Sequence, residues 1–386
     1  MSSELARSPA LAGRISSIDS LRGLVMLLML VDHVRERFFL HQQVSDPMNL
    51  DTTSPALFWS RIAAHLCAPS FVFLAGVSAW LYAHGGSGPV RPLTGFLLKR
   101  GLFLIVLEFT LVTFSWMGSY HTIWLQVIWA IGLSMICLAL VSHWPRPWLL
   151  VLGLTLVAGH NLLSPLQFSS DHWAYPVWTI LHDRNFLISD GPIRLKISYP
   201  LLPWIGVIVL GYWAGPWFAR GYDAVKRLQS LWLAGASCLL LFVVLRGSDL
   251  YGEPSALESG ISPTHTLMSM VNLTKYPPSL HFLLLTLGIS CLLLFAFERW
   301  SGRWQHWLTT LGGAPMFFYL LHLYALLLMY EVAVSVWGTN HGDLLGVEHV
   351  SQVWMIAVGL ALCLYPLTAW FARLKRRHSH GWLRYW

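Results

Sequence analysis

Apolar segments about as long as a lipid bilayer is thick follow one another along this chain. A helix needs about 20 mostly apolar residues to cross the hydrocarbon core of a membrane. Segments that fit this length lie at 20–40, 60–83, 95–115, 122–142, 147–163, 199–219, 229–246, 278–298, 310–331 and 352–373. The pattern predicts an all-α, polytopic integral membrane protein with about ten transmembrane helices in one bundle.

The scarcity of charge supports the same interpretation. Charged residues make up 11% of the 386 positions and apolar residues 55%, whereas a soluble domain carries roughly 25% charged residues. The net charge of +7 does not indicate nucleic-acid binding, because the basic residues are scattered over predicted helix ends. The five cysteines lie singly within apolar segments, so neither a metal site nor a disulfide framework is predicted.

The connecting segments differ in charge, and this difference predicts the orientation. The side that holds both termini carries 17 of the 25 Lys and Arg residues. The longer loops on the other side, at 41–59, 164–198, 247–277 and 332–351, are rich in Asp and Glu. Since basic loops stay in the cytoplasm, we expect a cytoplasmic tail at 1–13, a transmembrane domain at 14–374 and a basic cytoplasmic tail at 375–386.

Charged side chains occur where a membrane interior is expected, and such positions are costly and usually functional. Near the end of the first segment, Asp32 and Arg35 are three residues apart and share one helix face, as does Glu36. His33 points about 100° away from Asp32. The group is either a structural ion network or a functional site in the outer half of the membrane, where His33 could shuttle protons near neutral pH.

The next two segments carry further polar groups. Arg61 and His65 are one turn apart on the second segment, and His65 is either structural or part of a site. Glu108 lies near the middle of the third segment. A buried carboxylate needs a partner or becomes neutral, so we expect Glu108 to meet a histidine or arginine of another helix.

Later segments contain two more histidines of interest. His160 and Asn161 end the fifth segment and form either an interfacial pair or part of a site. His322 lies in the middle of the ninth segment with no charge near it, so it must find a polar partner. Gly76 and Ser78 are small residues of the kind that allow close packing of membrane helices.

Two absences narrow the function. The chain has no Gly-rich P-loop, so ATP-driven transport by this chain is not expected. It has no HExxH motif, so a zinc membrane protease is not expected either.

Several stretches together match a known pattern: SIDSLRG at 17–23, DHVR at 32–35, HLCAPSFVFLAG at 65–76, RGLFLIVLEF at 100–109, QVIWAIG at 126–132, GHNLL at 159–163, YPLLPWIGV at 199–207, YPPSL at 276–280, FFYLLH at 317–322 and YP at 365–366. With these stretches the chain, from about 14 to 386, resembles a bacterial membrane family. That family is related to the catalytic domain of heparan-alpha-glucosaminide N-acetyltransferase, within a wider group of transmembrane acyltransferases.

The resemblance implies that acetyl-CoA binds from the cytoplasm and that the acetyl group passes to an amine or hydroxyl of an envelope glycan or similar acceptor on the outer side. A histidine is suited to deprotonate such an acceptor, and cytoplasmic arginines are suited to hold the CoA phosphates. The candidate catalytic residues are His33, His65, Asp32 and His322, with Asp32 orienting or charge-balancing a histidine of a neighbouring helix. The candidate residues for binding substrate or acyl donor are Arg35, Arg61, Glu108, Gln126, Trp129, His160, Asn161, Arg22, Lys99 and Arg100.

The resemblance also sets expectations for location and partners. It implies a multi-pass protein of the bacterial inner membrane that uses no metal. The expected partners are the lipid bilayer and a small-molecule or glycan acceptor, with a homodimer as an option and no nucleic acid.

The chain departs from the heparan enzyme at one place. That enzyme has its catalytic histidine in the outer loop after the first helix, where this chain has none, and His41 is the nearest histidine. Asp32 and His33 fall, within a residue, where the heparan enzyme has an asparagine, whereas His322 corresponds to a histidine of its equivalent late helix. These four candidates would converge if the first, second and ninth segments adjoin.

Two other classes of protein remain as alternatives. Chains of intramembrane Asp, Glu and His also serve proton-coupled secondary transporters of small solutes, although no internal repeat of the kind found in transporters is evident here. A non-catalytic membrane scaffold would explain the hydrophobicity but would leave Asp32, Glu108 and His322 without a purpose.

Overall fold

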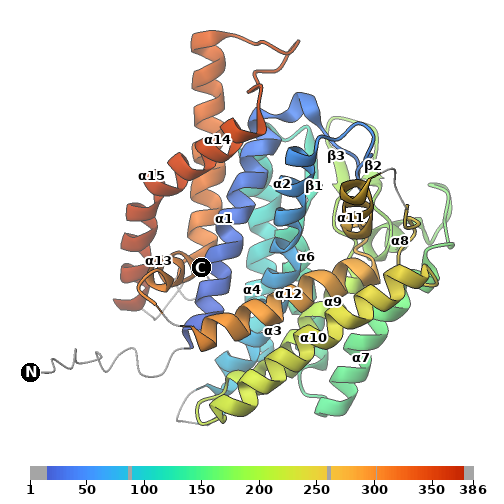
Figure 1. Ribbon diagram of the computed structural model, residues 1–386, viewed down its shortest axis with the longest axis vertical. Helices are drawn as coiled ribbons and strands as arrows, with labels where there is room; N and C mark the ends of the chain where they lie inside the picture. Colours follow the sequence, from blue (N-terminus) through green and yellow to red (C-terminus); the bar gives the residue numbers. More distant parts are fainter. Residues whose placement is uncertain (1–14, 86–88, 259–261, 301, 378–386) are drawn as a thin grey trace, which may run out of the picture.

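The computed structural model describes residues 15–85, 89–258, 262–300 and 302–377, which form a mostly helical bundle (Figure 1). The predicted tail at 1–13 lies outside the described residues, as does most of the predicted tail at 375–386. The longer helices are α1 (Ser16–Phe38), α3 (Cys67–His84), α4 (Thr94–Leu107), α6 (Val127–Val141), α7 (Arg146–Gly159), α9 (Leu202–Ala214), α10 (Ala224–Ser248), α12 (Leu280–Arg299), α14 (Pro315–Trp337) and α15 (Val350–Arg377).

Shorter elements join these helices. They are the helices α2 (Pro55–His65), α5 (Thr113–Met117), α8 (Tyr175–Leu181), α11 (Pro263–Val271) and α13 (Gln305–Gly312), the 3-10 turns η2 (Leu40–Gln42), η4 (His160–Leu163) and η5 (Gly215–Phe218), and the π-helical turn η3 (Glu108–Val112) that joins α4 to α5.

The described residues include six helical segments that are long and apolar enough to cross a membrane. These are α2 with α3, α7 with η4, α10, α12, α14 and α15. The helices at 127–141 and 202–218 are apolar but shorter, and the 23 residues of α1 carry charges near both ends. The structure is therefore that of a helical membrane protein, whereas the predicted count of about ten transmembrane helices is not confirmed.

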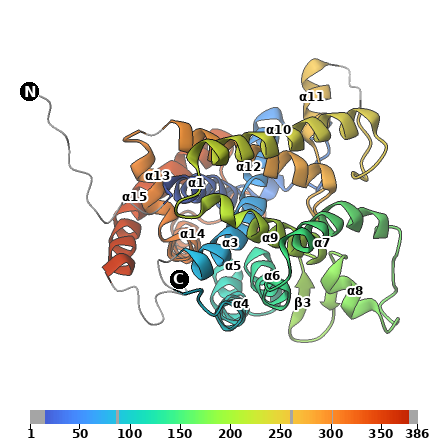
Figure 2. The same ribbon diagram turned by 90° about the horizontal axis from the view of Figure 1, so that it is seen from below.

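One end of the bundle holds the start of α1 and the ends of α12 and α15. Ser17 at the start of α1 donates a hydrogen bond of 2.5 Å to Glu298 at the end of α12, and Lys375 at the end of α15 lies 3.5 Å from the Gly313 carbonyl oxygen. We call this the terminus end and the opposite end the loop end. Figure 2 shows α1 near the middle of the bundle, with α3, α12, α13 and α14 around it.

A small sheet lies at the loop end. Its strands are β1 (Thr122–Leu125), β2 (Phe186–Ile188) and β3 (Arg194–Ile197), with β3 in the middle, parallel to β1 and antiparallel to β2. The prediction of helix at residues 122–125 is therefore wrong, and helix α6 begins only at Val127. The strand contains Thr122, Ile123 and Trp124, which are residue types that favour strands. Their pairing with β3 stabilises the strand more than their weak helix preference stabilises a helix.

Glycines allow several helices to meet backbone to backbone. A Cβ atom on Gly76 of α3 would lie 2.1 Å from the Ile208 oxygen of α9, and one on Gly211 of α9 would lie 2.1 Å from the Phe73 oxygen of α3. The two helices are thus closer than any side chain at these positions permits. This agrees with the predicted packing role of Gly76.

We expect Gly76→Ala to destabilise the protein by about 1–3 kcal/mol, because the added methyl group forces α3 away from α9. Gly95→Ala in α4 is the matched control, since a Cβ there meets nothing within 4 Å. Thermal denaturation of the purified variants in detergent measures the difference. An equal midpoint for both variants would contradict the close approach.

Two histidines join the elements that follow α1 and α14 at the loop end. The rings of His41 in η2 and His341 stack with centroids 3.7 Å apart and an interplanar angle of 4°, and His341 lies 3.2 Å from Glu348. Burial, reinforced by the charge of His341, lowers the pKa of His41, and Glu348 only partly opposes this. Protonation of the His41 ring is therefore disfavoured in the folded state.

This arrangement predicts a pH dependence of stability. The pKa of His41 is lower in the folded than in the unfolded chain. Its contribution to the free energy of unfolding is therefore complete above the ordinary pKa near 6.5 and is lost as the pH falls through the pKa of the folded state. We expect His41→Gln to reduce the loss of thermal stability between about pH 7 and pH 5. Exposed His143→Gln is the control, and an unchanged pH profile in His41→Gln would count against the stack.

Candidate functional site

A pair of histidines joins α1 to α14 inside the bundle. His33 Nδ1 and His322 Nε2 are 2.7 Å apart, and His322 Nδ1 is 2.7 Å from the Phe318 carbonyl oxygen. Because a carbonyl only accepts, His322 Nδ1 carries a hydrogen and, with both rings neutral, its Nε2 accepts one from His33 Nδ1. The lone pair of His33 is then on Nε2. The expectation that His322 finds a polar partner is confirmed.

Aromatic side chains enclose this pair. The ring centroids of Trp116 and Tyr319 lie 5.0 and 6.0 Å from that of His33, and Tyr319 is buried. Neither residue was predicted from the sequence. Aromatic side chains within apolar segments are common in membrane helices, so no local signal separates these two from the rest.

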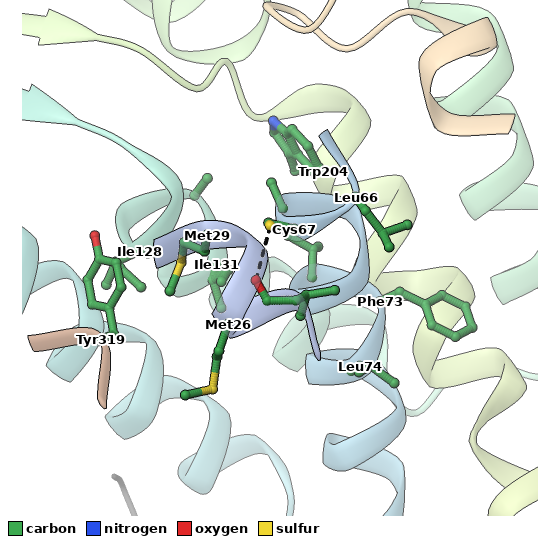
Figure 3. Close-up of a cluster of buried hydrophobic side chains, with 14 of the residues drawn as sticks. Met26, Met29, Leu66, Cys67, Phe73, Leu74, Ile128, Ile131, Trp204 and Tyr319 are labelled. Atoms are coloured by element: carbon green, nitrogen blue, oxygen red, sulfur yellow. Dashed lines mark hydrogen bonds between the residues drawn. The ribbon is translucent and has the colours of Figure 1, made fainter. Parts of the chain in front are cut away.

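A cavity of about 300 Å³ lies between α1, α3, α4, α6 and α14. At the terminus end it is lined by Arg22, Arg100 and Lys375. Deeper in the bundle it is lined by Met29, Ile128 and Tyr319, which gather on one side of α1 in Figure 3, with Cys67 and Trp204 on the other. The cavity therefore runs from basic residues to Tyr319, and the Tyr319 ring in turn contacts His33 and His322.

The predicted basic residues differ in their relation to this cavity. Arg22 donates to Ser78 Oγ and, at 3.2 Å, to Asp19 Oδ1, and its side chain lines the cavity. Arg100 is half-buried and also lines it. The preceding residue, Lys99, is exposed and does not line the cavity. Lys375, which sequence analysis placed in a basic tail, is instead part of α15 and of the lining.

Asp32 belongs to a separate ion cluster at the loop end. Its Oδ1 and Oδ2 accept hydrogen bonds of 2.9 and 2.8 Å from Arg61 of α2, and its Oδ1 accepts one of 3.1 Å from Arg35. Arg35 also pairs with Glu36. Two guanidinium groups thus occupy the oxygens of Asp32, so it holds no histidine by a hydrogen bond, but its charge acts on His33 and His65 and its charge-balancing role stays a prediction. Arg61 and Arg35, which were expected to bind substrate, pair with the half-buried carboxylates of Asp32 and Glu36.

His65 lies on the same side as this cluster. Its buried ring is 5.2 Å from that of Phe282, and the charges of Arg61 and Asp32 act on it. It makes no hydrogen bond to His33 or His322. The structure therefore brings together His33 and His322, places Asp32 with Arg61, and leaves His65 beside the latter pair, so the four predicted catalytic residues form two groups.

Glu108 has a different partner from the one expected. Its fully buried carboxylate accepts a hydrogen bond of 2.9 Å from the backbone N–H of Trp129, in the first turn of α6. The prediction of a histidine or arginine partner is wrong, because the free N–H groups at a helix start satisfy a carboxylate equally well. Gln126 is the residue that precedes this helix. These three residues position α6 against α4.

His160 and Asn161 hold loop-end elements together. The His160 carbonyl accepts a hydrogen bond of 3.0 Å from His182 Nε2, and Asn161 Oδ1 accepts one of 3.0 Å from the backbone N–H of Leu280 at the start of α12. Their contacts are with α8 and α12.

The fold and the site define a helical membrane protein with a histidine pair that contacts Tyr319 and a cavity lined by Tyr319 and three basic residues. The chain belongs to the family described as heparan-alpha-glucosaminide N-acetyltransferase, catalytic, whose family model matches residues 14–251. No curated protein matches the chain. The family indicates a membrane acetyltransferase-type function and gives no support to the transporter alternative.

The matched range ends just after α10 and contains only part of the site. His33, Arg22 and Arg100 lie within it, whereas His322 and Lys375 lie beyond it. Helices α12, α14 and α15 nevertheless pack directly on α1. The later segments therefore complete the cavity and the histidine pair.

We expect Arg61→Gln to destabilise the protein by about 3 kcal/mol, because removing one partner of a buried ion pair leaves the other charge poorly compensated. The exposed Arg194, at the same end of the bundle, supplies the control variant Arg194→Gln. Thermal denaturation in detergent compares them. Equal stability of both variants would show that the cluster is not a structural one.

Proposed function

We propose that the protein transfers an acetyl group from acetyl-CoA to an amine or hydroxyl. Acetyl-CoA would bind in the cavity lined by basic residues at the terminus end, and the acceptor would reach the histidine pair from the loop end. The observation that carries the proposal is the course of the cavity. It runs from three basic side chains at one end of the bundle to Tyr319, whose ring contacts both rings of the His33–His322 pair. The membrane acetyltransferase family supports the same chemistry.

The lining suits the parts of an acyl-CoA. Guanidinium and ammonium groups of Arg22, Arg100 and Lys375 match phosphates. Apolar walls match the flexible pantetheine arm. Arg22 and His33 are 11 residues apart on α1, so the arm would follow about 16 Å of helix to bring its thioester to the histidines.

His33 is the residue we propose as general base. Its Nε2 lone pair would take the proton of the acceptor amine or hydroxyl as the acceptor atom bonds to the acetyl carbon. The carbon–sulfur bond then breaks, and the departing CoA thiolate receives the proton from His33. His322 would act as a positioning residue, because its hydrogen bond holds His33 in the required tautomer.

The same argument gives an orientation. We infer that the terminus end faces the cytoplasm, where acetyl-CoA is made, because basic residues concentrate there. The loop end would then face outward from a bacterial inner membrane and receive the acceptor. Asp32 and Arg61 would shape the entrance on that side without taking part in proton transfer.

A binding measurement tests the donor site. We expect Arg100→Gln to raise the Kd for acetyl-CoA about tenfold or more, because a charge-assisted contact to phosphate is lost. Lys99→Gln, the neighbouring but exposed position, should leave the Kd unchanged. Isothermal titration of the purified proteins in detergent gives both values. No saturable binding of acetyl-CoA by the wild type at millimolar ligand would overturn the proposal.

A transfer measurement tests the base. We expect His33→Gln to keep acetyl-CoA affinity and to lose acetyl transfer to glucosamine by roughly 100-fold or more, as expected for loss of a general base. Release of free CoA thiol measures the rate. Transfer at the wild-type rate in His33→Gln would remove His33 from the mechanism while leaving the donor site intact.

A further inference from the structure

One buried lysine at the loop end has no role in the site described so far. Lys275 precedes α12 and is 4% exposed. Lysine is almost never buried to this extent unless it is paired, because desolvation of an ammonium group is costly. In the sequence, Lys275 was distinguished only by its position in a loop rich in Asp and Glu.

The segment that carries Lys275 is held firmly. The backbone N–H of Lys275 donates to Asp46 Oδ1 at 3.1 Å. On its two sides, Thr274 and Ser279 both donate from their hydroxyl groups to Glu253 at 2.5 Å, and Asn272 donates to the Met48 carbonyl oxygen at 2.7 Å. Lys275 is therefore fixed in its buried position by other groups.

The ammonium group itself has no such partner. Within residues 15–85, 89–258, 262–300 and 302–377, its Nζ makes no hydrogen bond and has no carboxylate close enough for an ion pair. The carboxylate of Asp32 is taken by Arg61 and Arg35. The Tyr276 ring, 5.1 Å away, gives only a weak cation–π contact.

The charge of Lys275 lies within electrostatic range of the site. It acts on Asp46, Asp32, the base His33 and His65. Beside it, Tyr276 contacts Tyr199 at 5.0 Å between ring centroids, and the guanidinium of Arg184 lies 4.4 Å from the Tyr276 ring. A second positive charge and two aromatic rings thus lie close to Lys275.

We propose that Lys275 binds an anionic group, a carboxylate or a phosphate, of the acetyl acceptor, so that the preferred acceptor is an acidic amine or alcohol, such as an acidic amino sugar, and not a neutral one. The inference rests on the proposed acetyl transfer. The bound anion supplies the partner that the buried ammonium lacks, and Tyr276 provides a surface for a sugar ring. Lys275 lies beyond the range matched by the family model.

The test compares amino sugars that differ in the anionic group they carry. Acetyl transfer from acetyl-CoA is measured for glucosamine, glucosamine 6-phosphate and muramic acid, with wild type, Lys275→Gln, Lys275→Arg and the control Lys196→Gln from the same end. We expect the wild type to prefer at least one of the two acidic sugars over glucosamine. Lys275→Gln should raise the KM for that sugar about ten- to hundredfold, with unchanged KM for glucosamine and unchanged acetyl-CoA binding, and Lys275→Arg should restore part of the loss.

The outcomes separate this inference from the proposed function. Preference for the phosphate or for the carboxylate in the wild type, lost in Lys275→Gln, identifies the anion. Equal use of neutral and acidic sugars by the wild type overturns the inference while the acetyl transfer stands, and this comparison holds even where Lys275→Gln fails to fold. A KM for the acidic sugars that does not change in a folded Lys275→Gln also overturns it. Failure of the wild type to bind acetyl-CoA instead overturns the proposed function.

Discussion

Polar groups that α1 carries into the interior of the bundle have no water to bind, so other parts of the protein must satisfy them. Asp32 is satisfied by Arg61 of α2 and Arg35 of its own helix, and His33 by His322 of α14. The contacts with Arg61 and His322 tie α1 to α2 and α14. Together with the packing of α3, α12 and α13 against it, they give α1 its central place in the bundle (Figure 2).

Two faces of α1 border different parts of the protein. One face, with Met29 and Arg22, borders the cavity that opens at the terminus end. The other, with Asp32, faces the ion cluster at the loop end. His33 lies where the two meet, because successive residues of a helix point about 100° apart. A donor and an acceptor that enter from opposite ends would meet there, with the histidine between them.

The part of the chain beyond the family match contributes as much to this arrangement as the part within it. His322 fixes the tautomer of His33, Lys375 lines the cavity, and the charge of Lys275 acts on His33. None of these three side chains lies within the matched residues 14–251. The site therefore depends on the packing of α12, α14 and α15 against α1.

The sequence by itself determined the helical membrane character, the approximate positions of the long helices and the need of His322 for a polar partner, because these follow from apolar length and from the cost of unsatisfied polar groups in lipid. It could not determine which partner each polar group finds. A guanidinium, an imidazole and a helix N-terminus all satisfy a buried carboxylate, and only the packing assigned Asp32 to Arg61 and Glu108 to the start of α6. The roles of Tyr319 and Lys275 were likewise decided by tertiary structure. The Tyr319 ring contacts His33 and the charge of Lys275 acts on it, both from elements far away in sequence, and no local pattern records such proximity.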